Sequence, residues 1–470
     1  DLVVVALTNV VQFLLAGVVG AALLVGLRTL LLELCKLFLQ LDHPLVQLSV
    51  ALLFHVRDLE TKLLFELRHL AVAGFVVDAM PTVPPGPLNR HVDDIRPFRV
   101  MEILHQADAM QRAGRSVIHM EVGEPDFPTP EGIAAAASAA LQAGQTRYTP
   151  AMGLPELRAA IAAHYPAACR PTAERIAITP GSSIALQLLF GLLLNPGDEV
   201  LLADPGYPCN ANFVRLYGGV PVGVPCDAET AFQLTAEAVV RHWRPQTRVV
   251  LVGNPSNPTG TLIAPAELAA IAAAVRERGG VLIVDEIYHG LVYDDAEVAS
   301  ALTLGEDVFV VNGFSKFYGM TGWRLGWLVA PPAYLDAINR LCQNLYIAAP
   351  TLAQHAALAA FSPGVQAELE RRRQIFQQRR DLLLQELPGL GFIVPVQPQG
   401  AFYIYAQIPE RGMGSDALAA WVLAQTGVAL TPGHDFGEHA AERHIRFAYT
   451  SASAQLTEGV ERLRGLLAAG

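Results

Sequence analysis

Asp285 follows directly after a short apolar run and Lys316 lies five residues beyond the end of another, where their side chains could do chemistry. A lysine that is partly desolvated or close to other cations has a lowered pKa and becomes a nucleophilic amine. An aspartate in such a place could hold a proton on a heterocyclic nitrogen. Taken singly, a lysine after a strand is more often solvated and an aspartate there is as often a helix cap, so neither residue decides the chemistry alone.

A second group of residues is suited to a phosphate. Gly181, Ser182 and Ser183 precede a long apolar helical segment, whose free backbone N–H groups and dipole favour an anion. Arg324 lies within Met320-Thr-Gly-Trp-Arg-Leu-Gly-Trp327, where glycine and tryptophan packing fixes a guanidinium as a two-pronged donor. The simpler explanations are an ordinary serine cap and a structural ion pair.

Five short apolar runs position these residues. Runs of this kind are typical of parallel strands buried on both faces, and residues 265–278 between two of them are predicted to form a helix. The alternation predicts a doubly wound α/β domain, in which ligands bind beyond the carboxyl ends of the strands. Polar residues follow every run, so we expect them to meet at one edge of the sheet. The five runs, each with the polar segment that follows it, are 175–179 with 180–183, 199–203 with 204–207, 248–252 with 254–260, 281–284 with 285–288, and 308–311 with 312–316.

Further motifs occur in a fixed order along residues 96–468. They are Ile95-Arg-Pro-Phe-Arg-Val-Met-Glu-Ile103, Glu121-Val-Gly-Glu-Pro-Asp-Phe-Pro-Thr-Pro130, Tyr148-Thr-Pro-Ala-Met-Gly153, Asn257-Pro-Thr-Gly260, Asp285-Glu-Ile-Tyr288, Ser315-Lys316, Gly322-Trp-Arg-Leu-Gly326, Pro398-Gln-Gly-Ala-Phe-Tyr403 and His444-Ile-Arg-Phe-Ala-Tyr449. With these motifs the chain resembles the class I/II aminotransferases, which are fold type I enzymes that depend on pyridoxal 5′-phosphate (PLP). The resemblance covers nearly four-fifths of the chain.

The resemblance implies a role for each candidate residue. Lys316 would carry the cofactor as an aldimine and act as the catalytic base, and Asp285 would keep the pyridine nitrogen protonated. Arg446, with help from the Gly123 N–H, would bind the substrate α-carboxylate. The remaining residues implied to hold the cofactor are Tyr288 and Asn257 at the ring oxygen, Tyr207 on the ring face, Ser182, Ser183, Ser315 and Arg324 at the phosphate, and Tyr148, which would reach the phosphate of a neighbouring subunit and so implies a homodimer.

The implied reaction is ping-pong transfer of an amino group between an α-amino acid and a 2-oxo acid. Two alternatives stay open. One is another PLP reaction on the same fold, such as a β-lyase. The other is a transcription regulator with an aminotransferase-like domain, which would need a basic segment in front, whereas residues 1–87 hold five Lys/Arg against seven Asp/Glu. The sequence does not identify the substrate, because no second arginine is assigned to a distal carboxylate. His434 and Asp435 lie in a loop for which two interpretations stay open: it faces the pocket, or, as is more often the case for such residues, it is solvated.

The resemblance also implies the domain arrangement. A large PLP-binding domain with a mostly parallel sheet should span residues 131–360. A smaller α/β domain should combine residues 88–130 with residues 361–470, including strands at 401–407 and 444–449.

Residues 1–87 form an apolar, leucine-rich extension of unlike composition, which ends in a proline-rich linker at 80–87. Residues 2–27 contain no charged residue and are long enough to cross a bilayer, which would leave the following part on the cytoplasmic side. Three interpretations stay open: a membrane anchor, spurious translation of upstream DNA, and an unfamiliar helical extension.

The bulk composition bounds the partners. The net charge of −11 argues against nucleic acid as a partner, and 52% hydrophobic against 16% charged residues argues against disorder. Five scattered cysteines form neither a disulfide framework nor a metal site, and no metal is expected. Small-molecule substrates and a cytoplasmic location are therefore expected.

Overall fold

The computed structural model describes residues 90–468. Its main sheet has seven strands, and the apolar runs predicted from the sequence form five of them. The order across the sheet is β2 (Ile176–Thr179), β8 (Gly326–Val329), β7 (Phe309–Gly313), β6 (Val281–Asp285), β5 (Thr247–Gly253), β3 (Glu199–Asp204) and β4 (Val220–Pro225).

The strands are mostly parallel, as predicted. From β7 to β4 all neighbours pair in parallel, whereas β8 pairs antiparallel with both β7 and β2. Because β2 is reversed twice relative to β7, it runs in the same direction as β7. The carboxyl ends of all five predicted strands therefore meet at one edge of the sheet, which confirms the prediction.

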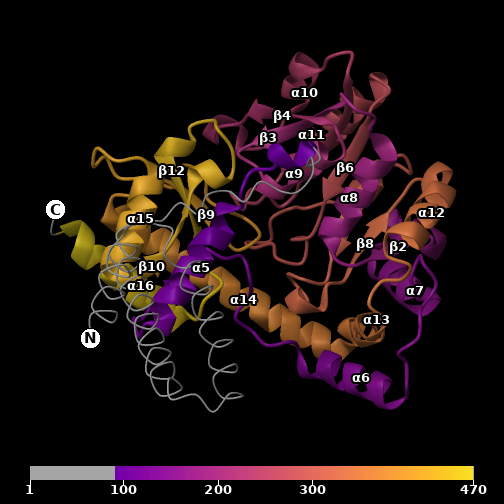
Figure 1. Ribbon diagram of the computed structural model, residues 1–470, viewed down its shortest axis with the longest axis horizontal. Coiled ribbons are helices and arrows are strands. Elements are labelled where there is room, and N and C mark those ends of the chain that lie inside the picture. The colour runs from indigo at the N-terminus through magenta and orange to yellow at the C-terminus, as the bar shows by residue number, and fades with distance from the viewer. Residues whose placement is uncertain (1–89, 469–470) are drawn as a thin grey trace, which may run out of the picture. The chain divides into compact units, whose positions relative to one another are not determined.

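Both faces of this sheet are covered by helices (Figure 1). Along β5, Val249 and Leu251 pack into one core and Val250 and Val252 into the other, because successive strand residues point to opposite faces. Burial stabilises each such side chain by about 1.5–3 kcal/mol. The helices of this part are α6 (Glu131–Gln142), α7 (Pro155–His164), α8 (Ser182–Leu193), α9 (Pro208–Leu216), α10 (Ala236–His242), α11 (Pro265–Glu277), α12 (Leu335–Leu345) and α13 (Thr351–Leu358).

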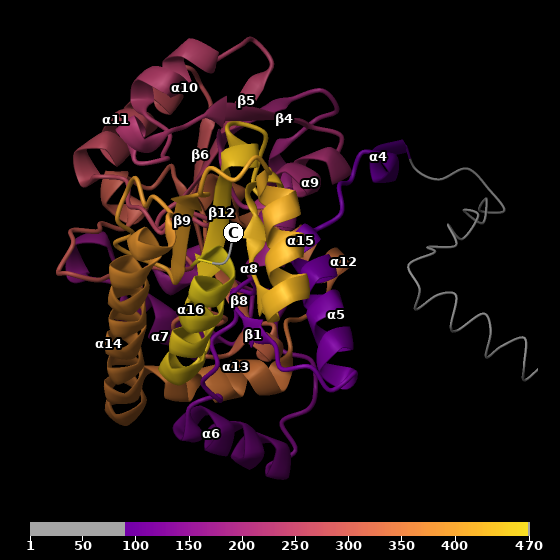
Figure 2. The ribbon, with the colours of Figure 1, turned by 90° about the vertical axis from the view of Figure 1, so that its left-hand side faces the viewer.

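The remaining elements form a second, smaller α/β part with its own core. Figures 1 and 2 both show α5, from near the start of the described chain, beside α15 near its end. Ala107 of α5 and Leu423 of α15 share one apolar cluster, so the two ends of the sequence pack together. The elements of this part are α4 (Arg90–Asp93), α5 (Arg99–Arg112), β1 (Ile118–His119), α14 (Pro363–Glu386), β9 (Tyr403–Gln407), α15 (Ser415–Thr426), β10 (Val428–Ala429), β11 (Thr431–Pro432), β12 (His444–Ala448) and α16 (Ser453–Ala468).

The helix α14 links the two cores. Val365 and Leu369 pack into one core of the large sheet, and Phe376 and Leu383 pack into the core of the smaller part. The division of the chain at 88–130, 131–360 and 361–470 stays a prediction. The extension 1–87 lies outside the described residues, and within residues 90–468 no helix is both long and apolar enough for a membrane crossing.

Candidate active site

A cavity of about 1180 Å³ lies at the edge of the sheet where the five strand ends meet. It brings together all but one of the residues to which the resemblance gives a role. Those that line it are Gly123, Ser182, Ser183, Tyr207, Asn257, Asp285, Tyr288, Ser315, Lys316, Arg324 and Arg446. The exception is Tyr148, which does not line the cavity and whose side chain is 81% exposed.

Lys316 is the only lysine among residues 90–468. It follows β7, and its Nζ donates to the Gly123 carbonyl oxygen at 2.7 Å. Burial lowers the pKa of Lys316 to about 8, with the charges of Arg446 and Arg324 adding to that effect and those of Glu124 and Asp285 opposing it. Roughly a tenth of this amine is therefore uncharged at pH 7, far more than for an ordinary lysine, and the uncharged form is the one that acts as a nucleophile or base.

Asp285 ends β6 and faces the same cavity. Burial raises the pKa of its carboxyl to about 7, although the N–H of Ile287 donates to it at 3.1 Å and Lys316 attracts it. The charged form is thus short of counter-charge. A cationic group placed in the cavity beside Asp285 would stabilise the carboxylate.

Arg446, in the middle of β12, is a buried cation that is 2% exposed. It donates to neutral oxygens: Nη1 to the side-chain oxygen of Asn257 at 2.9 Å and Nη2 to the carbonyl oxygen of Glu121. Among the described residues, no carboxylate lies within ion-pair distance of it, and its Nε has no partner. A buried guanidinium without a carboxylate is costly, so the arrangement favours an anionic ligand.

Arg324 and Gly181 lie close together at the start of α8. Gly181 has φ +88°, and a Cβ built on it would be 2.7 Å from Nη2 of Arg324. Arg324 itself adopts a left-handed conformation, and its Nη1 donates to the Thr321 carbonyl oxygen at 3.0 Å. The absence of a side chain at Gly181 lets the guanidinium approach the helix N-terminus, where N–H groups and dipole already favour an anion.

Tyr403 lines the cavity, although neither its position nor the resemblance predicts a role for it. Its hydroxyl lies 3.0 Å from that of Tyr288, and a Cβ at Gly123 would lie 1.8 Å from the same hydroxyl oxygen. Tyr403 belongs to the Pro398–Tyr403 motif, but its contact with Tyr288 joins residues far apart in the sequence, so spacing along the chain does not predict it.

Asp435 and His434, for which the sequence favoured a solvated position, both have polar partners in the structure. Asp435 is only 5% exposed, lines the cavity and accepts the backbone N–H of Arg99 at 2.9 Å. His434 also lines the cavity and its Nδ1 lies 2.5 Å from a carboxylate oxygen of Asp416. For Asp435 the expectation of a solvated loop residue is wrong, because the loop packs against α5.

Comparison with known proteins agrees with the site. Residues 115–463 match the family model of aminotransferase class I and II. The chain belongs to this family. It is 40% identical over 372 residues to a valine–pyruvate aminotransferase of Mycobacterium tuberculosis, which covers 78% of this chain and 96% of the relative. A (5-formylfuran-3-yl)methyl phosphate transaminase of Methanocaldococcus jannaschii is 36% identical, with 81% and 99% covered.

Solved structures give the same result. The crystal structure of an aminotransferase from Mycobacterium tuberculosis superposes with a TM-score of 0.79 at 38% identity, covering 82% of this chain and all of that one. Aspartate aminotransferase from Thermus thermophilus with maleate gives a TM-score of 0.75 at 34% identity, covering 80% and 98%. The chain is therefore an aminotransferase of fold type I, as the sequence predicts, and the relatives favour this activity over the lyase and regulator alternatives.

Proposed function

We propose that this aminotransferase binds PLP in the cavity described above, on Lys316, and moves an amino group between an α-amino acid and a 2-oxo acid. One observation carries the proposal: the amine of Lys316, the carboxyl of Asp285 and the guanidinium of Arg446 line one cavity. They are the nucleophile, the counter-charge and the carboxylate receptor that this reaction needs. Class I and II aminotransferases depend in general on PLP, which supports the choice of cofactor.

The lining residues fit the cofactor at both ends. A phosphate would be held by the first turn of α8 with Ser182 and Ser183, by Ser315 and by Arg324, which approaches because Gly181 has no side chain. Asp285 would hold a proton at the ring nitrogen, since a cation there supplies the counter-charge that its carboxylate lacks. Tyr207 would lie against the ring face.

Bound PLP withdraws electrons from the substrate Cα, which makes the Cα proton removable. Lys316 Nζ, released from the cofactor when the substrate amine takes its place, would then accept that proton as a neutral amine, a form that its lowered pKa favours. Asn257 and Tyr288 would donate to the ring oxygen. The side-chain oxygen of Asn257 already accepts from Arg446, so its two N–H donors are left for that contact.

Arg446 would bind the substrate α-carboxylate. Two aromatic rings fix its guanidinium, whose Cζ lies 4.3 Å from the centre of the Tyr403 ring and 4.6 Å from that of Phe436. The carboxylate would supply the anion that the buried charge lacks, and the Gly123 N–H would assist. This contact orients every α-amino acid in the same way, with its Cα toward Lys316.

We further propose a homodimer in which Tyr148 reaches the phosphate site of the partner subunit. In the single chain Tyr148 is 81% exposed and does not line the cavity. A residue that contributes to the site of another subunit should be exposed in this way. We also propose a cytoplasmic location. The four cysteines among the described residues are free thiols, which suits a reducing compartment. If residues 2–27 are a membrane anchor, the catalytic part would face the cytoplasm.

The test is a half-reaction in single turnover. Purified holoenzyme is mixed with one amino acid at a time, without an acceptor acid, while the absorbance spectrum and the products are recorded. The proposal predicts that the spectrum changes to that of the amino form of the cofactor, with one 2-oxo acid per site and no ammonia. Release of ammonia with pyruvate would instead identify a lyase, and a spectrum that no amino acid changes would refute the proposed reaction.

A further inference from the structure

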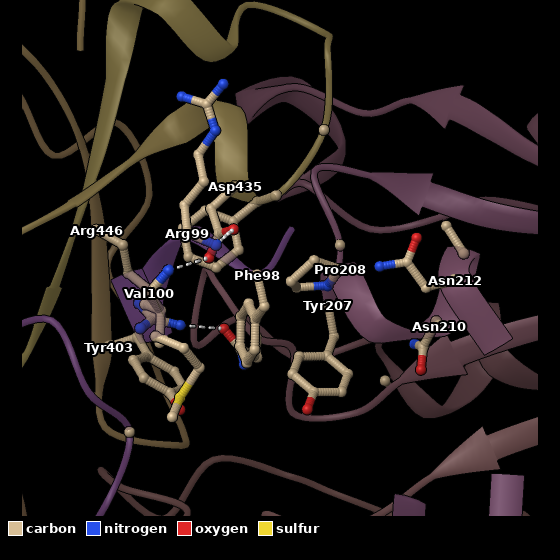
Figure 3. Close-up of a pocket in the computed structure, with 18 of the residues that line it drawn as sticks. Phe98, Arg99, Val100, Tyr207, Pro208, Asn210, Asn212, Tyr403, Asp435 and Arg446 are labelled. Atoms are coloured by element: carbon tan, nitrogen blue, oxygen red, sulfur yellow. Dashed lines mark hydrogen bonds between the residues drawn. The ribbon is translucent and has the colours of Figure 1, made fainter. Parts of the chain in front are cut away.

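The segment that leads into α5 forms one wall of the cavity. Phe98 precedes the helix and Val100 is in its first turn, and both line the cavity. The Phe98 ring packs edge-to-face on Tyr207, with ring centres 6.1 Å apart and an interplanar angle of 86°. Figure 3 shows the Phe98 ring between Tyr207 and the Arg446–Tyr403 pair. A substrate bound through Arg446 would thus have its side chain beside Phe98.

This wall is held by a residue from the other end of the sequence. Phe98 occupies the N-cap position of α5, where it provides no side-chain cap. Asp435 takes over that function: its two carboxylate oxygens accept the backbone N–H groups of Arg99 at 2.9 Å and of Val100 at 3.3 Å (Figure 3). A carboxylate at a helix N-terminus is favoured by the helix dipole as well as by the hydrogen bonds. Asp435 therefore positions Phe98 and Val100.

The cations of this region are already engaged. Arg96 pairs with Glu438, Arg99 pairs with Asp416, and Arg215 donates to the side-chain oxygen of Asn212. Of the other described lysines and arginines that line the cavity, Lys316, Arg324 and Arg446 serve the cofactor and the α-carboxylate under the proposed function. A second carboxylate on a substrate side chain beside Phe98 and Val100 would meet apolar groups. Of the nearby cations, Arg96 and Arg99 are paired with carboxylates and Arg215 is held by the neutral oxygen of Asn212.

We propose that Phe98 and Val100 form the substrate side-chain subsite, that Asp435 positions them by capping α5, and that this subsite selects uncharged apolar amino acids over dicarboxylic ones. This inference rests on the proposed function, because it names the substrate class of the same site. Phe98 and Val100 contact the apolar side chain, and Asp435 acts through them without touching the substrate.

The test compares kcat/KM of the full-chain holoenzyme for valine, phenylalanine, alanine, aspartate and glutamate. Wild-type enzyme should prefer valine or phenylalanine over both dicarboxylic acids. Phe98→Ala should lower kcat/KM for those two by about 10- to 200-fold, the usual range for lost apolar pocket contacts. Alanine, whose side chain is too short to reach the wall, should be affected much less. His105→Ala is the control, since His105 is an exposed α5 residue that does not line the cavity.

A second pair of variants tests the positioning residue. Asp435→Ala should reproduce the selective loss for large apolar substrates, mainly as a higher KM, with an unchanged cofactor spectrum. Asp435→Asn should restore most of the activity, because the amide oxygen still accepts a backbone N–H of α5. If Asp435→Ala lowered kcat/KM equally for all five substrates and Asp435→Asn did not restore it, Asp435 would have a general structural role and the proposed positioning of Phe98 and Val100 would be wrong.

The outcomes separate this inference from the proposed function. If the wild-type enzyme transaminates aspartate or glutamate better than valine and phenylalanine, or if Phe98→Ala leaves the ratios unchanged, the inference is wrong while the proposed function stands. If the wild-type enzyme converts none of the five amino acids and its cofactor spectrum stays unchanged with each, the proposed function itself fails.

Discussion

The guanidinium of Arg446 lies over the ring of Tyr403, with 4.3 Å between Cζ and the ring centre. The contact joins neighbouring strands, since β12 and β9 pair antiparallel and Arg446 is opposite Tyr405 in the register. An aromatic face supports a cation without neutralising it. The charge of Arg446 thus remains directed into the cavity, where a ligand carboxylate can meet it.

Replacing the guanidinium of Arg446, which offers two parallel N–H donors, should weaken substrate binding. Arg446→Lys keeps the charge but removes the two-pronged geometry, so we expect KM for every α-amino acid to rise by about 10- to 150-fold, equivalent to losing one charge-assisted hydrogen bond. The cofactor spectrum should be unchanged. Steady-state kinetics check this, with Arg443→Lys on the exposed stretch before β12 as control. A normal KM would mean that another residue binds the carboxylate.

The close approach of Gly181 and Arg324 predicts an effect on cofactor affinity. Gly181→Ala would place a Cβ 2.7 Å from Nη2 of Arg324 and would strain a residue at φ +88°. At φ +88° and ψ 162° the backbone lies in a region essentially restricted to glycine, where another residue costs about 1–3 kcal/mol, and the added Cβ would displace Arg324, so PLP affinity should fall by about tenfold or more. Fluorescence titration of the cofactor-free protein with PLP measures this. Gly364→Ala, with nothing within 4 Å of the added Cβ, should bind PLP normally; equal affinities in both variants would refute a phosphate site here.

Tyr148 allows a complementation experiment for the dimer. Lys316→Ala and Tyr148→Ala should each lose activity alone. When the two are mixed and reassociated, half of the dimers carry one intact site, so activity should return to about one quarter of wild type. If activity does not return although mixed dimers form, Tyr148 does not serve the partner's site.

Glu286 gives a prediction for the pH dependence of stability. It is fully buried, accepts the Ala301 N–H at 2.7 Å, and burial raises its pKa to about 8. The folded state therefore holds a proton that the unfolded state has released, and this contribution to stability is lost as pH rises toward 8. Between pH 6.5 and 8 the free energy of unfolding of the cofactor-free wild-type protein should therefore decrease by about 2 kcal/mol more than that of the Glu286→Gln variant, whose side chain stays neutral.

Urea unfolding at the two pH values measures this difference. The neighbouring His289, whose pKa burial lowers to about 4, stays uncharged in the folded state over this interval. Its titration in the unfolded state is the same in both proteins and cancels in the comparison. The same decrease in both proteins would show that Glu286 is already ionised in the folded state.

The strands of the large sheet could be predicted because they are buried on both faces and therefore consist of continuous runs of apolar residues. The runs at 281–284 and 308–311 indicated strands by themselves, and parallel pairing then placed Asp285 and Lys316 on one edge. The cavity residues from the strand ends followed from that rule together with the family motifs.

The substrate side of the site was not predictable in the same way. Asp435 caps a helix that begins 336 residues earlier in the chain, and no local pattern signals such a contact. Tyr403 meets Tyr288 across 115 residues. Both contacts depend on how the two ends of the sequence pack together, whereas spacing along the chain predicts only local structure.

The central claim is that Lys316 carries the cofactor. Reduction of the holoenzyme with borohydride followed by digestion and mass spectrometry tests it directly, because reduction makes a lysine–cofactor bond permanent. Only Lys36, Lys62 and Lys316 occur in the chain, so the assignment is unambiguous. We predict one phosphopyridoxyl group per chain, on the peptide that contains Lys316, and none after Lys316→Ala. A group on Lys36 or Lys62, or none on any lysine of the wild-type protein, would contradict the account.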